Sequence, residues 1–132
     1  MMMRTVRLFG VAMMAFLTLI AGAGASSAAP TPRCDGERAT IKGTDRDDDI
    51  EGTDDDDVIV GKDGDDEING RRGDDIICGD RGDDELNGGR GDDILIGGRG
   101  EDTLDGGPGD DVCLIDRDDE FRSCETVIYY HD

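Results

Sequence analysis

A nine-residue repeat runs without a gap from Gly43 to Leu114, and it constrains the fold more than any other feature of the sequence. Its eight units read GTDRDDDIE, GTDDDDVIV, GKDGDDEIN, GRRGDDIIC, GDRGDDELN, GGRGDDILI, GGRGEDTLD and GGPGDDVCL. Glycine holds the first position of every unit, aspartate holds the sixth, and an apolar residue holds the eighth. A fixed period of this length predicts a solenoid, in which each repeat stacks on its neighbours.

The pattern within each unit predicts turns that alternate with short β-strands. The first six positions are rich in glycine and aspartate, which are typical of turns, and the last three, such as Ile94-Leu95-Ile96, favour extended backbone. We expect two units to form a coil of 18 residues, with strands of successive coils in parallel about 4.8 Å apart. The sequence therefore predicts an all-β solenoid with two short-stranded parallel sheets. The core would be the eighth positions: Ile50, Ile59, Ile68, Ile77, Leu86, Leu95, Leu104 and Cys113.

Positions seven and nine flank the inward residue, should point outward, and change character from one unit to the next. They are mostly polar in the odd units and apolar in the even units, which gives a true period of 18 and one sheet with an apolar outer face. That face would consist of Val58, Val60, Ile76, Cys78, Ile94, Ile96, Val112 and Leu114. A continuous exposed apolar surface indicates a covering element or a partner. We expect the C-terminal tail, which holds Phe121, Val127, Ile128, Tyr129 and Tyr130, to fold back over it. The alternative is a homodimer or another protein partner.

The units resemble the RTX (hemolysin-type) calcium-binding nonapeptide, G-G-x-G-x-D-x-U-x. Gly88 to Ile96 (GGRGDDILI) matches it fully, as do the two units that follow. The first four units depart from it: position two is Thr44, Thr53, Lys62 or Arg71, and the first two units also lack glycine at position four. The resemblance implies a calcium-binding parallel β-roll (a right-handed β-helix solenoid). In it the position-six aspartates serve calcium together with carbonyl oxygens of the turns. These aspartates are Asp48, Asp57, Asp66, Asp75, Asp84, Asp93, Asp102 and Asp111.

Stacking of alternate units should place these aspartates in two columns, one at each edge of the roll. One column would hold Asp48, Asp66, Asp84 and Asp102, and the other Asp57, Asp75, Asp93 and Asp111. Ca²⁺ takes six to eight oxygen ligands, so an ion between stacked turns would neutralise carboxylates that otherwise repel, with about six ions as the ceiling. We expect the chain to be largely disordered without calcium and to fold on binding it.

Two further acidic positions of the repeat are open to more than one interpretation. Position five is acidic in every unit, and we interpret it as a solvated residue in preference to a second ligand. At position three, Asp45, Asp54 and Asp63 are candidate ligands in the early, glycine-poor turns.

The segment before the repeats has the pattern of a secretory signal peptide. Arg4 and Arg7 precede an apolar run, and small residues follow it up to Ala29, with cleavage expected after Ala28. A membrane anchor is the alternative, although the run is marginal for a full span. We therefore expect a signal peptide at 1–28, an N-terminal cap at 29–42, the repeats at 43–114 and a C-terminal cap or tail at 115–132. The mature protein would be secreted, extracellular and not held in a membrane.

Four cysteines indicate disulfide bonds in an exported domain of this size. Three connectivities are possible. Cys113 and Cys124 flank an interrupted ninth unit, 115–123, in which Arg122 takes the apolar position, so a bridge there would hold the C-terminal cap. Cys34 and Cys78 would then pair and draw the N-terminal segment across the apolar face. A zinc site is the alternative interpretation of the four cysteines. Their spacing does not match a zinc-binding motif, and His131 is the one histidine of the sequence.

Charge and motif content exclude several classes of function. A net charge of −20 is unsuited to nucleic acid, because phosphate would be repelled. No catalytic motif is visible, and we expect no enzymatic activity. The sequence predicts a calcium-dependent extracellular binding or surface module, or alternatively a structural or calcium-buffering matrix protein without a specific partner. As a chain of repeats with an N-terminal signal, it resembles standalone secreted repeat proteins of high-GC Gram-positive bacteria.

Overall fold

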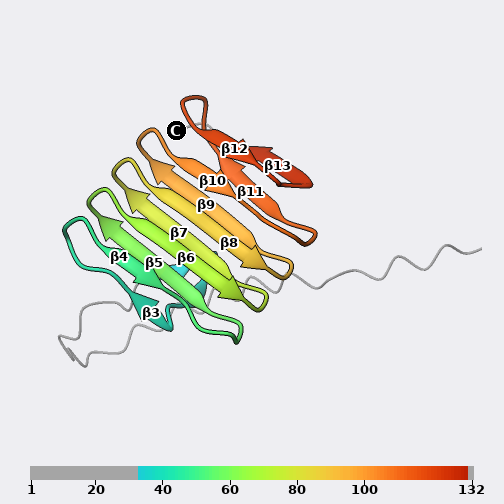
Figure 1. Ribbon diagram of the computed structural model, residues 1–132. Coiled ribbons are helices and arrows are strands. Elements are labelled where there is room, and N and C mark those ends of the chain that lie inside the picture. The colour runs from blue at the N-terminus through green and yellow to red at the C-terminus, as the bar shows by residue number, and fades with distance from the viewer. Residues whose placement is uncertain (1–32, 131–132) are drawn as a thin grey trace, which may run out of the picture.

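The computed structural model describes residues 33–130, which form a β-solenoid of about 5 turns with about 18 residues in each turn (Figure 1). One parallel sheet contains β4 (Asp49–Glu51), β6 (Glu67–Arg72), β8 (Glu85–Arg90), β10 (Thr103–Asp105) and β12 (Glu120–Arg122). The second contains β3 (Ile41–Lys42), β5 (Val58–Asp63), β7 (Ile76–Arg81), β9 (Ile94–Arg99), β11 (Val112–Ile115) and β13 (Thr126–Tyr129). A hairpin of β1 (Arg33–Cys34) and β2 (Glu37–Arg38) precedes them. The predicted β-roll is confirmed.

Strand pairing within the repeats follows the predicted period of 18 residues. In the second sheet Ile59 pairs with Ile77, Ile77 with Leu95, and Leu95 with Cys113. The odd units supply the first sheet and the even units supply the second. Two units therefore form one coil, and the polar and apolar outer faces fall on different sheets as expected.

The strands of the middle coils are longer than the three residues that the pattern predicts. Strands β5 to β9 have six residues each and continue through the first three positions of the next unit. Backbone groups of those positions find partners one coil away, as between Lys62 and Asp80, so the ladder continues past the bend. From the third unit onward the bend gives position two a positive φ, for example 97° at Lys62 and 81° at Asp80.

The core is one cluster of apolar side chains between the two sheets, with one row from each sheet. The eighth-position residues, from Ile50 to Cys113, are all buried, and Ile115 extends the cluster toward the C-terminal end. Parallel stacking places each of these side chains against its counterparts in the neighbouring coils. The invariant apolar column of the sequence is therefore the core, as predicted.

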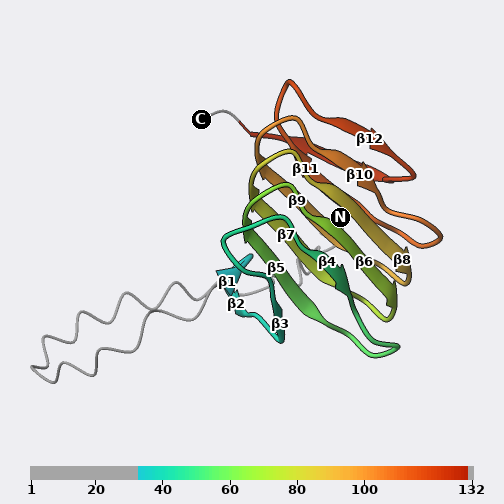
Figure 2. The same cartoon turned by 60° about the vertical axis from the view of Figure 1, so that its left-hand side comes forward.

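The N-terminal hairpin covers part of the apolar outer face of the second sheet. Cys34 is fully buried and packs with Val60 and Cys78, which are also buried. Cys34 is bonded to Cys78, with 5.8 Å between their Cα atoms. Figure 2 shows the hairpin beside β3 and β5. The sequence expectation that this pair would draw the N-terminal segment over the face is met.

The expectation that the C-terminal tail folds back over the apolar face is wrong. Strand β12 adds to the first sheet and β13 adds to the second, so the tail continues the solenoid (Figure 1). Pairing with the preceding coil gives the backbone of the tail its hydrogen-bond partners. Packing across the outer face of the sheet would leave those backbone groups unpaired. Tyr130 does reach back: its hydroxyl donates to the carbonyl oxygen of Gly98 at 2.5 Å and accepts from the Gly98 N–H at 3.0 Å.

The register of the tail also differs from the sequence expectation. Phe121, not Arg122, stands opposite Leu104 in the apolar row, because the ninth unit is one residue shorter than the others. Arg122 instead contacts the Asp105 carboxylate, with 2.8 Å between Nε and Oδ2. Cys113 and Cys124 are bonded, which ties β11 to the segment between β12 and β13. This is the pair that the sequence favoured.

The proposed signal peptide, at 1–28, lies outside the described residues. Within 33–130 no helix is long and apolar enough to cross a membrane.

Candidate calcium sites

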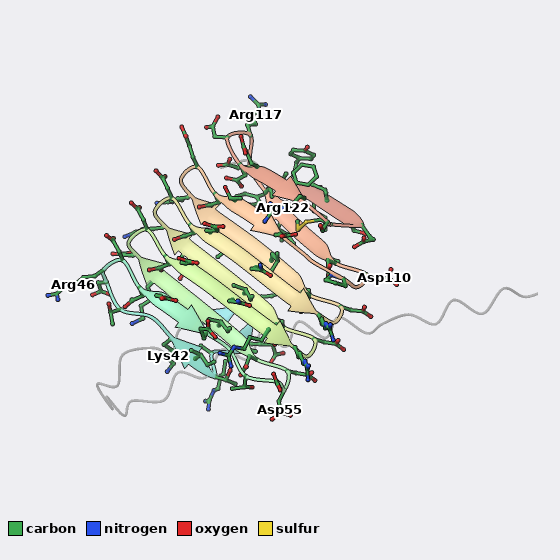
Figure 3. All side chains as sticks on the ribbon, viewed as in Figure 1. Lys42, Arg46, Asp55, Asp110, Arg117 and Arg122 are labelled. Carbon is green, nitrogen blue, oxygen red and sulfur yellow. A yellow bond between two sulfur atoms is a disulfide. The ribbon has the colours of Figure 1, made fainter. Side chains whose placement is uncertain are left out.

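The turns of the repeat form the two long edges of the solenoid. Odd units turn at one edge, where Figure 3 labels Arg46 and Arg117, and even units turn at the other, where it labels Asp55 and Asp110. Each turn ends at the position-six aspartate, immediately before a strand begins. The expected two columns of aspartates are therefore present, one along each edge.

Within each column the aspartates are bonded to one another's backbone. After the first aspartate of each column, Oδ1 accepts the backbone N–H of the counterpart one coil earlier, as Asp84 does from Asp66 at 2.8 Å. The bond recurs at 2.8 or 2.9 Å along both columns, ending with Asp102 at one edge and Asp111 at the other. The carboxylates are thus fixed to the solenoid and not free to turn toward solvent.

The second carboxylate oxygen behaves differently along the columns. Oδ2 is buried and has no hydrogen-bond partner in six of the eight aspartates: Asp66, Asp75, Asp84, Asp93, Asp102 and Asp111. A buried carboxylate oxygen without a partner is costly, because it has lost its water and gained nothing in return. Six such oxygens at equivalent places indicate positions that a cation would satisfy.

The position-one glycine makes room for each of these oxygens. A Cβ built on Gly79 would lie 2.1 Å from Oδ2 of Asp84 and 2.6 Å from the carbonyl oxygen of Gly97, one coil further on. Carboxylate and carbonyl oxygens thus gather around the same small space, which only glycine leaves open. These are the oxygen types that Ca²⁺ prefers.

The first two aspartates have their Oδ2 atoms satisfied by the chain itself. Oδ2 of Asp57 accepts the Thr53 N–H at 2.7 Å and the Thr53 hydroxyl at 2.8 Å. Oδ2 of Asp48 accepts the same two groups of Thr44. Threonine at position two therefore distinguishes these turns from the six with an unpartnered oxygen.

Two acidic residues that sequence reasoning missed extend the columns into the tail. Asp119 accepts the Asp102 N–H at 3.1 Å, and Oε2 of Glu125 accepts the Asp111 N–H at 2.8 Å. Both stand two residues before an apolar residue, Phe121 or Val127, as the repeat aspartates do. The signal that could have found them is an acidic residue two positions before an apolar one, but these two residues depart from the nine-residue spacing.

Comparison with protein-family models gives a match to four copies of the RTX calcium-binding nonapeptide repeat, over residues 42–77 and 79–113. The chain belongs to the RTX calcium-binding repeat family. Comparison with curated proteins and with solved structures found no match. The repeats and the solenoid both fit calcium binding.

The RTX columns shift the pKa values of their carboxyl groups in opposite directions. Burial, reinforced by neighbouring carboxylates, raises the pKa of Asp75 and Asp84 to about 7. In the first coil, the Thr44 N–H and hydroxyl hold the pKa of Asp48 below 3.8. Burial opposes the same effect at Asp57, but hydrogen bonds from Thr53 and Thr40 outweigh it, so that pKa is also lowered. The six aspartates with an unpartnered Oδ2 therefore favour a positive charge from outside the chain. Asp48 and Asp57 already accept hydrogen bonds from threonine.

The position-five acids of the RTX units form a second, outer ladder. Oδ1 of Asp65 accepts the Asp83 N–H at 3.0 Å, and the same bond recurs along both edges, always from the coil that follows. These side chains are exposed, as expected of solvated residues, but they also hold successive turns together. Neither sequence interpretation included that bonding.

The donor set of the RTX turns fits Ca²⁺ and not a metal held mainly by side chains. Across residues 33–130, no three histidine, cysteine or acidic side chains converge on one point. A bound ion would therefore be held by a position-six carboxylate together with backbone carbonyl oxygens of the stacked turns. Calcium accepts such a set because it binds carbonyl oxygens and tolerates irregular geometry.

Proposed function

We propose that the protein is a secreted, non-catalytic calcium-binding module that completes its fold by binding several Ca²⁺ ions along the two edges of the solenoid. The observation that carries this proposal is the set of six buried Oδ2 atoms without a hydrogen-bond partner. Each open oxygen faces the space that a position-one glycine leaves, as Gly79 does for Asp84. One ion at each would give about six per chain.

Calcium supplies the positive charge that lets buried carboxylates remain ionised at neutral pH. Because an unfolded chain would not hold these oxygens together, the binding free energy becomes folding free energy. The net charge of −20 strengthens the coupling, since bound cations relieve repulsion in the compact state. Dissociation constants of about 10⁻⁴ to 10⁻³ M, typical of extracellular modules, would suit this role.

The deciding experiment is a calcium titration of the chain without residues 1–28, followed by calorimetry for stoichiometry and by circular dichroism for β-structure. We expect several ions per chain and a rise in β-signal that tracks their binding. A full β-spectrum in excess chelator, unchanged by calcium, would contradict the coupling. Magnesium serves as the matched control, because it prefers octahedral sites and keeps its waters.

Export is supported by the two disulfides, which fit a non-reducing environment. The signal-peptide pattern at 1–28 agrees with it. Mass spectrometry of the protein recovered from culture medium tests this point, with Ala29 expected as the first residue. A cell-retained chain with an intact N-terminus would argue for a membrane anchor.

A partner surface is proposed on the part of the apolar outer face that is distant from the hairpin. There Ile94, Val112 and Leu114 are half-buried, and Ile128 is 48% exposed at the end of the row. Ile96 marks the border of this surface, because it packs against the cluster of Cys34, Val60 and Cys78. A homodimer or another protein would cover it in the calcium-loaded state. Light scattering in calcium tests for the dimer, with Leu114→Asp as the disrupting variant. A monomer that captures no defined partner would favour the alternative, a structural or calcium-buffering matrix protein.

A further inference from the structure

The first coil of the solenoid differs from the later coils in how its position-six carboxylates are satisfied. Asp57 accepts three donors from the chain: the Thr53 N–H and hydroxyl at Oδ2, and the Thr40 hydroxyl at Oδ1 at 3.1 Å. Asp75, the next member of the same column, accepts the Asp57 N–H at Oδ1 and has nothing at Oδ2. We call a carboxylate closed where the chain donates a hydrogen bond to its Oδ2, and open where its Oδ2 has no partner. The column therefore changes from closed at Asp57 to open at Asp75, within one coil.

The same closure occurs at the other edge and at the far end of that edge's column. Asp48 accepts the Thr44 N–H and hydroxyl at one oxygen. At the C-terminal end, Asp119 accepts the Asp102 N–H at one oxygen and the Asp116 N–H at the other, at 2.7 Å. In this column the open carboxylates of Asp66, Asp84 and Asp102 thus lie between two carboxylates, Asp48 and Asp119, that the chain itself satisfies.

Thr40 links this closure to the N-terminal segment. Its hydroxyl accepts the Val58 N–H at 2.9 Å while it contacts Asp57, and its own N–H donates to the Val58 carbonyl at 2.8 Å. The hairpin before it is fixed to the second coil by the Cys34–Cys78 bond and packs on Val60. Covalent, apolar and hydrogen-bonding contacts therefore all meet at the N-terminal end, and none of them uses a metal.

We propose that Thr40, Thr44 and Thr53 take the place of calcium in the first coil. That coil is then a calcium-independent end of the solenoid, on which the calcium-dependent coils fold. This inference rests on the proposed function, because it assigns which turns take ions and which do not. Without calcium, the first coil keeps its structure. The later coils, whose position-six aspartates have an unpartnered Oδ2, lose theirs.

The first test compares aspartates of one column by ion count. Asp75→Asn should lower the calorimetric stoichiometry by one ion per chain, whereas Asp57→Asn should leave it unchanged. An equal loss in both variants would overturn the proposal. A wild-type chain that binds no calcium would overturn the proposed function instead, and the second test then decides the threonine closure by itself.

The second test is hydrogen exchange in excess chelator, read at individual amides. The Thr53 and Val58 amides should stay protected, while the Ile94 and Val112 amides exchange rapidly. Thr53→Val, which removes the hydroxyl and keeps the shape, should abolish the protection without changing the ion count, and Thr53→Ser should retain it. Uniform exchange along the wild-type chain, or protection that survives in Thr53→Val, would contradict the assignment.

Discussion

Substitution of Gly79 by alanine tests the tight stacking of the turns at the candidate sites. Gly79 has an ordinary backbone conformation, so alanine introduces no left-handed strain and only the space matters. Its Cβ would lie 2.1 Å from Oδ2 of Asp84 and 2.6 Å from the Gly97 carbonyl oxygen, whereas ordinary contact is 3.4–4 Å. The Asp84 carboxylate must therefore move by more than an ångström.

The cost follows from what that movement breaks. Oδ1 of Asp84 accepts the Asp66 N–H at 2.8 Å, and a displacement of this size ends the bond. Loss of a buried bond to a charged group costs about 1.5–3 kcal/mol, and overpacking adds about 1–3 kcal/mol. We expect Gly79→Ala to lower the free energy of unfolding by about 3–5 kcal/mol, a large part of the total stability of a small domain.

Urea unfolding in saturating calcium measures this change, and calorimetry of the same variant should show the loss of the ion at Asp84. Gly36→Ala is the matched control, because a Cβ there meets no atom within 4 Å. The control has a φ of 85° and should cost only about 1–2 kcal/mol of backbone strain. A Gly79→Ala protein as stable as the control, with the full ion count, would refute the stacking argument.

Three other perturbations have defined outcomes. Asp80→Gly should raise the melting temperature in calcium, because it relieves a φ of 81° and so adds about 1 kcal/mol to the free energy of unfolding. In excess chelator, the β-structure measured by circular dichroism should be greater at about pH 5 than at about pH 8. Buried carboxyl groups with pKa values raised from 3.8 to about 6 or 7 bind protons in the fold, so stability falls as pH rises through that range; the opposite slope would contradict it. Calorimetry of cysteine-to-serine variants should show that loss of the Cys34–Cys78 disulfide lowers the free energy of unfolding by about 4 kcal/mol, and loss of Cys113–Cys124 by about 3 kcal/mol. The difference arises because the first disulfide closes a loop of 44 residues and the second a loop of 11.

The sequence by itself determined the repeat region of this protein almost completely. Because side chains repeat every 18 residues, one register alone stacks like residues on like, and the sheets, the core rows and the two aspartate columns all follow from it. Alternation of outward residues identified which sheet has the apolar face. The family match over 42–77 and 79–113 agrees with that reading.

Only the tertiary structure decided the two ends, where the period fails. Phe121 stands 17 residues after Leu104, and Val127 stands 14 after Cys113, so spacing no longer fixed the register and strand pairing selected it. The repeat pattern likewise did not predict which aspartates the chain itself satisfies, since every unit carries the same carboxylate at position six. The difference arises from Thr44 and Thr53, whose hydrogen bonds form only when the turn brings them back to the aspartate four residues on. A repeat specifies its interior by symmetry, but an end has one neighbour fewer, and contacts outside the repeat must satisfy the groups left there.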